Sequence, residues 1–181
     1  MKKLILFAAI LFVGVSVVKA QVGDSREGNV NLKVTLVGIH SIEIFSGQEN
    51  VELKYDGISI YEEGAKKELK DHLRVYSNSG FSVNVKASTN FIATDGLNTE
   101  VMDLSTIKII TTKGTDNTDI DPLEGSKDLS LTATNIIESN VAGFNKFFSV
   151  EYQGGTDYGI LFKDGAENVF TTDLVYTIVP N

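Results

Sequence analysis

Residues 72–88 read HLRVYSNSGFSVNVKAS, and this stretch decides the fold class that the sequence predicts. Apolar and polar side chains alternate on both sides of the tripeptide Asn78-Ser79-Gly80. A period of two places every second side chain on the same face, which is typical of a strand with one buried face. A turn-forming tripeptide between two such runs predicts a β-hairpin over these residues.

The same alternation recurs along the chain and predicts further short strands. It is strict at Val30, Leu32, Val34 and Leu36. Nine or ten short strands separated by polar turns predict an all-β fold, an immunoglobulin-like β-sandwich. The other expected strands cover residues 42–44, 51–55, 58–60, 91–94, 104–112, 129–133, 147–152, 158–162 and 169–179. The inward-facing positions are expected to include Val83, Val85, Phe148, Val150, Tyr176 and Ile178.

One stretch, residues 62–72, has helical composition. It is rich in Glu, Lys, Ala and Leu, which are good helix formers, but its apolar positions are sparse. We expect one or two exposed helical turns that act as a solvated connector, with a partner-binding helix as the alternative. Both histidines, His40 and His72, are expected at the surface.

The first twenty residues have the pattern of a secretory signal peptide. Lys2 and Lys3 precede an apolar run over residues 4–18, and Val18 and Ala20 match a small-residue cleavage site. The alternative, a membrane anchor, is disfavoured because that run is shorter than the roughly 20 residues needed to span a bilayer. The predicted organisation is a signal peptide (1–20), a flexible leader (21–28) and a single β-sandwich domain (29–181).

Composition excludes several functional classes. The chain has 16 basic and 24 acidic residues, a formal net charge of −8, which argues against nucleic-acid binding. Cleavage of the signal peptide would remove three lysines and no acidic residue, and so make the chain more acidic still. With no Cys and two His, the chain has no disulfides, no thiol nucleophile and no multi-His metal site.

The motifs of common enzyme classes are absent from the sequence. It contains no G-x-S-x-G elbow, P-loop, dinucleotide fingerprint or H-E-x-x-H motif. We therefore expect no catalytic residues and no bound cofactor, and a function that is not enzymatic.

Two clusters suggest ligands, each with a simpler alternative. Asn117, Asp119 and Asp121 place oxygen ligands at alternate positions, as a calcium loop would, although Pro122 stands where an EF-hand needs Gly. The alternative is a solvated acidic loop. Aromatic residues near the C-terminus could form a platform for glycans or another subunit, but we expect most of them in the core. These are Tyr152, Tyr158, Phe162, Phe170 and Tyr176.

The order of these segments resembles a group of small exported, pilin-like or spore-coat-like β-sandwich proteins of bacteria. The matching features are the signal peptide and the early alternating strand at residues 30–37. They also include HLRVYSNSGFSVNVKAS (72–88), FFSVEYQGG (147–155) and TTDLVYTIVPN (171–181). The resemblance implies assembly through protein contacts and brings no catalytic residues with it.

The resemblance also raises a choice for the early strand. In chaperone–usher pilins an N-terminal strand completes the sandwich of the neighbouring subunit, and residues 29–37 have the alternating side chains of such a donor. The alternative, which we favour because alternation shows half-burial and does not identify a partner, is that this segment is the first strand of its own domain.

The sequence thus predicts an exported, non-enzymatic surface or fimbria-like subunit, structural or adhesive, in the periplasm, at the cell surface or outside the cell. Its expected partners are like subunits or other cell-surface proteins, with no nucleic acid and no membrane span after signal cleavage. The alternative function is a secreted binding module for calcium or glycan.

Overall fold

The computed structural model of the chain describes residues 30–93, 102–156 and 169–181. The described residues between Val37 and Asn181 form a β-sandwich, and residues 30–36 belong to a separate unit, which is described by itself. The predicted signal peptide and leader lie outside the described residues. Within the described ranges, no helix combines the length and the apolar character needed to cross a membrane.

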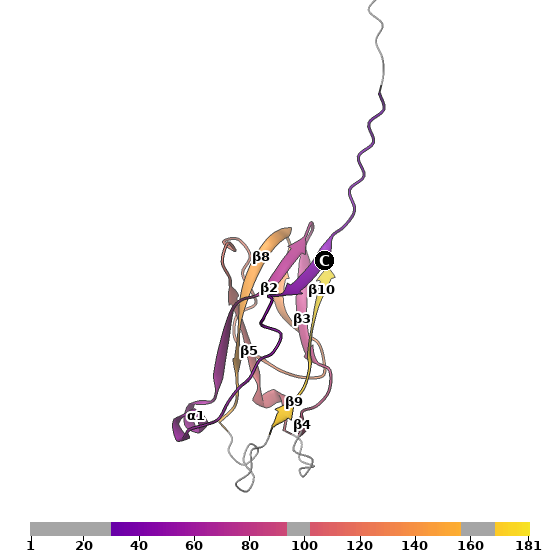
Figure 1. The fold of residues 1–181 in the computed structure, drawn as a ribbon. Coiled ribbons are helices and arrows are strands. Elements are labelled where there is room, and N and C mark those ends of the chain that lie inside the picture. The colour runs from indigo at the N-terminus through magenta and orange to yellow at the C-terminus, as the bar shows by residue number, and fades with distance from the viewer. Residues whose placement is uncertain (1–29, 94–101, 157–168) are drawn as a thin grey trace, which may run out of the picture. The chain divides into compact units, whose positions relative to one another are not determined.

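Two antiparallel sheets make up the sandwich, and the predicted all-β fold class is confirmed (Figure 1). The first sheet has the order β1 (His40–Ile44), β2 (Lys66–Ser77), β8 (Gly143–Gln153), β5 (Lys108–Lys113), β6 (Lys127–Asp128). The second has the order β10 (Leu174–Pro180), β3 (Phe81–Ala87), β7 (Thr134–Ser139). The smaller elements are β4 (Ile92–Ala93), which pairs with β9 (Phe170–Thr171), helix α1 (Ile58–Glu63) and the 3-10 turn η1 (Leu104–Thr106).

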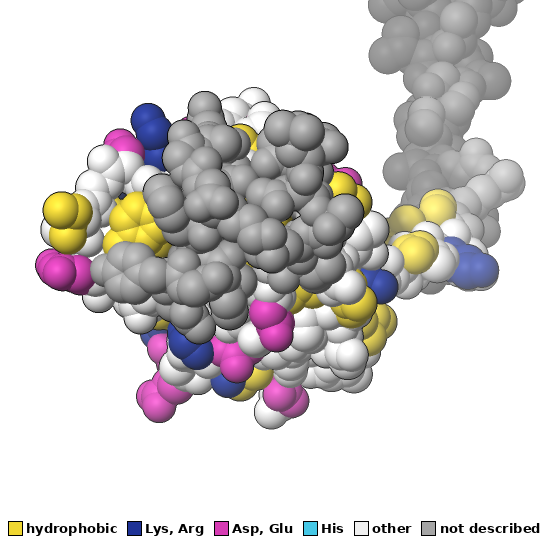
Figure 2. All heavy atoms as spheres, turned by 90° about the horizontal axis from the view of Figure 1, so that it is seen from below, with side chains coloured by type: hydrophobic (Ala, Val, Ile, Leu, Met, Phe, Trp, Pro, Cys, Tyr) yellow, Lys and Arg dark blue, Asp and Glu magenta, His cyan; other side chains and the backbone are white. Residues whose placement is uncertain are grey.

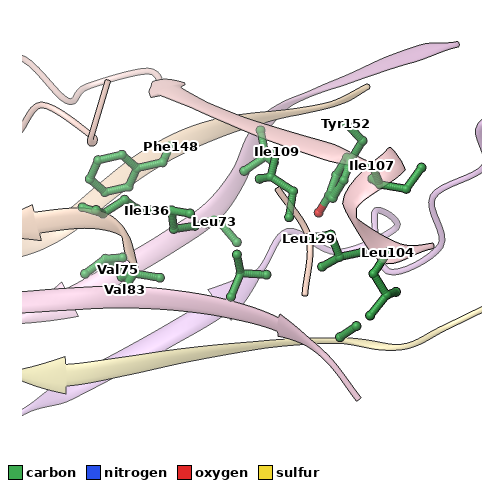
Figure 3. Close-up of a cluster of buried hydrophobic side chains, with 14 of the residues drawn as sticks. Leu73, Val75, Val83, Leu104, Ile107, Ile109, Leu129, Ile136, Phe148 and Tyr152 are labelled. Carbon is green, nitrogen blue, oxygen red and sulfur yellow. The ribbon is translucent and has the colours of Figure 1, made fainter. Parts of the chain in front are cut away.

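The core lies between the sheets and follows the alternation of the strands. Figure 3 shows Leu73 and Val75 of β2 meeting Val83 of β3, with Phe148 of β8 close by. The inward positions expected from the sequence are confirmed: Val83, Val85, Phe148 and Val150 are buried, and Tyr176 and Ile178 are half-buried against the core.

The predicted β-hairpin at residues 72–88 is wrong in its pairing. Both strands are present, as β2 and β3, but β2 belongs to the first sheet and β3 to the second. The turn between them is therefore a corner that crosses the sandwich. A Cβ at Gly80 would lie 3.0 Å from the Ser139 carbonyl oxygen, so the corner is tight. Alternation shows which face is buried, but it does not identify the neighbouring strand.

The predicted helical connector at residues 62–72 is also wrong. Helix α1 ends at Glu63, and from Lys66 onward the chain is strand β2, paired with β8 from Lys66–Gln153 to Leu69–Val150. Pairing with a neighbour overrides the weak helix propensity of Glu and Lys. The register shifts between Leu69 and Leu73, where Asp71 has a positive φ of 54°. This bulge turns His72 inward.

Four other expected segments differ from the structure or fall outside it. Residues 51–55 are not in a strand, and residues 58–60 are part of α1. The strand expected at 129–133 lies a few residues later, as β7. The one expected at 158–162 lies outside the described residues.

The predicted strand at residues 30–37 is likewise not a strand. None of these residues has regular secondary structure, so the interpretation of the segment as the first strand of its own domain is corrected. A half-buried strand needs a sheet to pair with. The alternating pattern is present here without a partner strand among the described residues of the chain.

Candidate assembly site at the outer edge of strand β10

Strand β10 forms one edge of the second sheet. It pairs with β3 along its whole length, from Leu174 opposite Ala87 to Pro180 opposite Phe81. No other described strand pairs with it. Strand β1, the edge of the first sheet, lies beside β10 on the same side of the sandwich (Figure 1). The two sheet edges therefore border a common seam.

The backbone bonds of β10 show which of its groups point to the open edge. Ser88 N–H donates to the Asp173 carbonyl (2.8 Å), and Asn181 N–H donates to the Gly80 carbonyl (3.0 Å). In an antiparallel ladder every second residue bonds to the same neighbour. The odd-numbered residues from 173 to 181 therefore bond to β3. The residues whose backbone groups point to the outer edge are Leu174, Tyr176, Ile178 and Pro180, of which Pro180 has no N–H.

The open edge carries neither a charged residue nor a bulge, and Pro180 stands only at its end. Edge strands commonly carry charged residues or bulges that prevent pairing with another chain. The sequence of β10, LVYTIVP, has no charge, and its register with β3 runs without a shift. Two outward side chains, Val175 and Val179, are 39% and 42% exposed. The edge is therefore suited to accepting another strand.

The side chains that face the core along the seam are not fully buried. On β10 these are Leu174, Tyr176 and Ile178, and on β1 they are Ile42 and Ile44. All five are half-buried, whereas Val83 and Val85 on the neighbouring strand β3 are 0% and 3% exposed. We call these five residues the β1–β10 seam. A further strand along β10 would bury their remaining apolar surface.

A chain of hydrogen bonds, buried at its centre between Tyr152 and His72, ties β10 to the first sheet. The hydroxyls of Tyr176 and Tyr152 lie 2.5 Å apart, and the Tyr152 hydroxyl lies 3.0 Å from His72 Nε2. On the other side of the ring, His72 Nδ1 lies 3.0 Å from Gln48 Oε1. The Gln48 amide orientation is set by its Nε2, which donates to the Lys70 carbonyl (3.0 Å).

These contacts determine the protonation state of His72. Because Gln48 Oε1 can only accept, Nδ1 carries the proton and Nε2 accepts from the Tyr152 hydroxyl, which in turn accepts from Tyr176. Burial lowers the pKa of His72 from 6.5 to about 4. The negative charge of Glu49 acts in the opposite direction and raises this pKa, but its effect is smaller than that of burial. Burial also raises the pKa of Tyr152 to about 12 and that of Tyr176 well above 10. The neutral chain is thus the stable form at neutral pH.

The surface position expected for His72 is therefore wrong, since its side chain is only 2% exposed. Alternation through Leu73 and Val75 would point His72 outward, and the bulge at Asp71 reverses this. The sequence offered little sign of the bulge, because Asp71 is stabilised by a distant residue: Thr115 donates to its carboxylate from both N–H (2.6 Å) and hydroxyl (2.7 Å). His40 is half-buried, with Nδ1 2.9 Å from the Ser77 hydroxyl.

The three residues of the predicted calcium loop each have a protein partner. Asn117 is buried; its Oδ1 accepts from Ile120 N–H (3.1 Å) and its Nδ2 donates to the Phe147 carbonyl (3.2 Å). Asp119 pairs with the Lys146 ammonium (2.5 Å), a hydrogen bond that lowers the pKa of Asp119, and Asp121 pairs with that of Lys113 (2.7 Å). Among the described residues, no three His, Asp or Glu side chains converge on a possible metal position. Calcium binding stays a prediction that no contact favours.

The C-terminal aromatic residues that the structure describes pack in or against the core, as expected. Tyr152 is 3% exposed, and Tyr176 and Phe170 pack against the core cluster. Tyr158 and Phe162 lie outside the described residues. The aromatic residues that the structure describes in this group thus serve packing.

Figure 2 views the sandwich from its lower end, where acidic and basic side chains are interspersed on the described surface.

The N-terminal segment, defined as residues 30–36, is the other unusual feature. Its four apolar side chains are 72% to 89% exposed. They are Val30, Leu32, Val34 and Leu36. A single exposed apolar residue is ordinary, but four at alternate positions of one short segment indicate an interaction surface.

No protein-family model and no curated protein matches the chain. Two features of the described residues suggest an interaction surface: the open edge of β10 and the four exposed apolar side chains of the N-terminal segment.

Proposed function

We propose that the protein is an exported, non-enzymatic structural subunit that associates with further copies of itself through its N-terminal segment. The observation that carries this proposal is the exposure of Val30, Leu32, Val34 and Leu36, at 72% to 89%. Such a face is costly in water and is stabilised by burial in a partner. The expected secretory signal supports a role outside the inner membrane.

The alternating pattern determines how the segment would bind. A period of two puts the apolar side chains on one face of an extended strand and Asn31, Lys33 and Thr35 on the other. A strand of this kind binds by adding to the edge of a sheet, where backbone hydrogen bonds supply affinity and side chains supply specificity. The bound segment would have one face in a core and the other in water.

The estimated free energies of burial and of association support reversible binding. Burying four Val and Leu side chains stabilises a complex by roughly 6 to 12 kcal/mol, since each contributes about 1.5 to 3. Loss of translational and rotational freedom costs about 4 to 15 kcal/mol. The two terms nearly balance, so backbone hydrogen bonds of about 1 kcal/mol each decide the affinity. We therefore expect assembly that depends on protein concentration.

The test adds charge to one face of the segment and then to the other. The double variant Leu32→Asp, Val34→Asp places two carboxylates on the apolar face, while the control Asn31→Asp, Thr35→Asp adds the same charge to the polar face. Light scattering after size-exclusion chromatography measures the mass over a range of concentrations. We expect concentration-dependent oligomers for the wild type and the control, and monomers for the apolar-face variant. A monomeric wild type, or equal assembly of both variants, would contradict the proposal.

A further inference from the structure

We propose that the outer face of the first sheet carries a binding site for a neutral carbohydrate. The residues that would form it are Glu43, Arg74, Tyr76 and Phe144. This site is separate from the open edge of β10, which belongs to the second sheet, and it does not depend on self-association of the chain. Three observations carry the inference: the register of three strands, one exposed aromatic ring, and the charged groups beside that ring.

The register of three neighbouring strands brings these side chains together. Strand β2 lies between β1 and β8 in the first sheet (Figure 1). Tyr76 of β2 pairs with Phe144 of β8. Two residues earlier on β2, Arg74 pairs with Glu43 of β1 on one side and with Phe147 of β8 on the other. Paired and adjacent residues on one face of a sheet lie within reach of each other's side chains.

A bulge in β8 places two aromatic side chains on this outer face. Phe148 is 0% exposed and faces the core, so its neighbour Phe147 points outward. Phe144 lies three residues before Phe147, and in a regular strand it would point to the opposite face. The register shifts here, because Asn145 is an extra residue with a positive φ of 59°. Phe144 therefore also lies on the outer face, where it is 68% exposed.

Arg74 is held in position by three contacts. Its guanidinium lies over the ring of Tyr76, 4.7 Å from the ring centre, and over that of Phe147, at 5.4 Å. Its Nε donates to the side-chain oxygen of Asn145 (2.7 Å). Within the described residues, no hydrogen bond uses either terminal nitrogen of the guanidinium. The sheet thus presents a positioned fork of N–H donors that can bind a ligand.

Phe144 supplies an apolar surface next to this fork. Its ring packs against that of Tyr76, with ring centres 5.3 Å apart and ring planes at 75°. Every other large apolar side chain in the strands of the first sheet is buried or half-buried. One exposed ring is too small for a stable protein interface, which buries about 800 Å² on each partner. It suits a small ligand that has one apolar face.

The charges beside Phe144 favour a neutral ligand with hydroxyl groups. Arg74 Nη1 and Glu43 Oε2 lie 3.8 Å apart, farther than the roughly 3.2 Å of a direct N–H···O hydrogen bond. A hydroxyl between them can accept from the guanidinium and donate to the carboxylate at the same time. A ligand carboxylate has no proton to donate to Glu43 and is repelled by it, and an ammonium group has no lone pair with which to accept from Arg74.

A sugar ring has both features that this surface complements. One face of a pyranose carries C–H groups that pack on an aromatic ring, and its rim carries adjacent hydroxyls. In the proposed complex the C–H face lies on Phe144, and a hydroxyl of the rim bridges Arg74 and Glu43. Because Arg74 is already held by its neighbours, little side-chain entropy is lost when the sugar binds.

An NMR titration of the isotope-labelled full chain tests the site. The neutral probes are cellohexaose, maltohexaose and chitohexaose, and the acidic probe is hexagalacturonic acid, each at millimolar concentration. We expect at least one neutral probe to shift the amide signals of Arg74, Tyr76 and Phe144 in a saturable way, and the acidic probe to cause no saturable shift. Unchanged signals with all three neutral probes, or tighter binding of the acidic probe, would overturn the proposal.

Variants then assign the binding to the named side chains. We expect Phe144→Ala and Arg74→Lys each to weaken binding of the neutral probe at least tenfold, because the first removes the ring and the second the guanidinium fork. Phe144→Trp keeps an aromatic surface and should bind as the wild type does. The matched control, Ile58→Ala, removes an 80% exposed apolar side chain from helix α1, which precedes the opposite end of β2, and should leave binding unchanged.

Thermal denaturation checks that all four variants keep the fold. Equal binding by Phe144→Ala and Ile58→Ala would contradict the proposal. A lower mass of Phe144→Ala in light scattering, with no sugar-dependent shift in the wild type, would also contradict it and would assign the exposed ring to a protein contact instead.

Discussion

Strand β3 and the N-terminal segment carry nearly the same pattern and have opposite environments. In β3, Phe81, Val83, Val85 and Ala87 alternate with polar residues and are at most 3% exposed. In the segment, four apolar residues alternate in the same way and are at least 72% exposed. The comparison shows that a period of two does not by itself make a buried strand, because burial also needs a sheet for the segment to pair with.

The largest expected effect contrasts one residue from each region. Val85→Asp places an unpaired charge in the core, and we expect a loss of more than about 4 kcal/mol in unfolding free energy, enough to unfold most of the protein. Val34→Asp makes the same chemical change at an exposed site, and we expect the stability of the monomer to change by less than about 0.5 kcal/mol. Urea denaturation at a concentration that keeps the protein monomeric measures both. A comparable loss for Val34→Asp would place the segment in the chain's own core.

A smaller effect concerns the hydrogen bonds from His72 through Tyr152 to Tyr176, which connect the open edge strand β10 to the first sheet. The pKa of His72 is lowered from 6.5 to about 4 by burial, so the unfolded chain takes up the proton first as the pH falls. The contribution to stability is complete above pH 6.5 and is lost as the pH falls toward 4. We expect the loss attributable to His72 to be about 3 kcal/mol.

The measurement compares urea denaturation of the wild type and His72→Gln at pH 7 and pH 4. Subtracting the variant removes the pH dependence that the two proteins share, so that the difference reports His72 alone. An equal pH dependence in both proteins would show that the His72–Tyr152–Tyr176 chain does not depend on a neutral imidazole.

The third prediction concerns a single backbone group, the N–H of Ile178, at the open edge of β10. The N–H of Ile178 points to the open edge, whereas the bonds to β3 come from Thr177 and Val179. Ile178→Pro therefore removes one donor from this open edge and none from the sandwich. Compared with Ile178→Ala, which also shortens the side chain, we expect assembly to weaken about tenfold, the equivalent of one hydrogen bond. Equal dissociation constants from sedimentation analysis would indicate that this N–H has no role in assembly.

The smallest effect is expected in the acidic loop. Asp119 and Asp121 form ion pairs with lysines, but their side chains are 53% and 82% exposed. Surface pairs of this kind contribute little, so Asp119→Asn with Asp121→Asn should change stability by less than about 1 kcal/mol. Thermal denaturation with and without calcium, on both proteins, also checks the calcium prediction. A calcium-dependent rise in the midpoint of the wild type alone would support a metal site there.

These cases show how far the sequence could predict the molecule. Alternation was sufficient to place Val85 and Phe148 in the core, because the burial of a strand face is a local property. It could not show that β2 and β3 lie in different sheets, or that residues 66–72 pair with β8 rather than form a helix. Those outcomes depend on contacts between residues far apart in the chain.

For the candidate assembly site, too, the sequence could predict one part and could not predict the other. The N-terminal segment was visible in the sequence as an alternating run, with both a domain strand and a donated strand open as interpretations. The open edge of β10 was not visible, because an edge exists only once the strand order is known. The sequence of β10 resembles that of any inner strand, and its lack of charge becomes informative only at the edge of a sheet.

The most direct test of the central claim is the amide hydrogen exchange of β10 when the segment is supplied separately. A variant lacking residues 30–36 should fold as the wild type does, because those residues belong to a unit separate from the sandwich. To this variant we would add a peptide of residues 29–37 and follow each amide of β10 by NMR. We predict that exchange slows at least tenfold at Leu174, Tyr176 and Ile178, and stays unchanged at Val175, Thr177 and Val179. Unchanged exchange at all six, or protection on another edge of the sandwich, would contradict it.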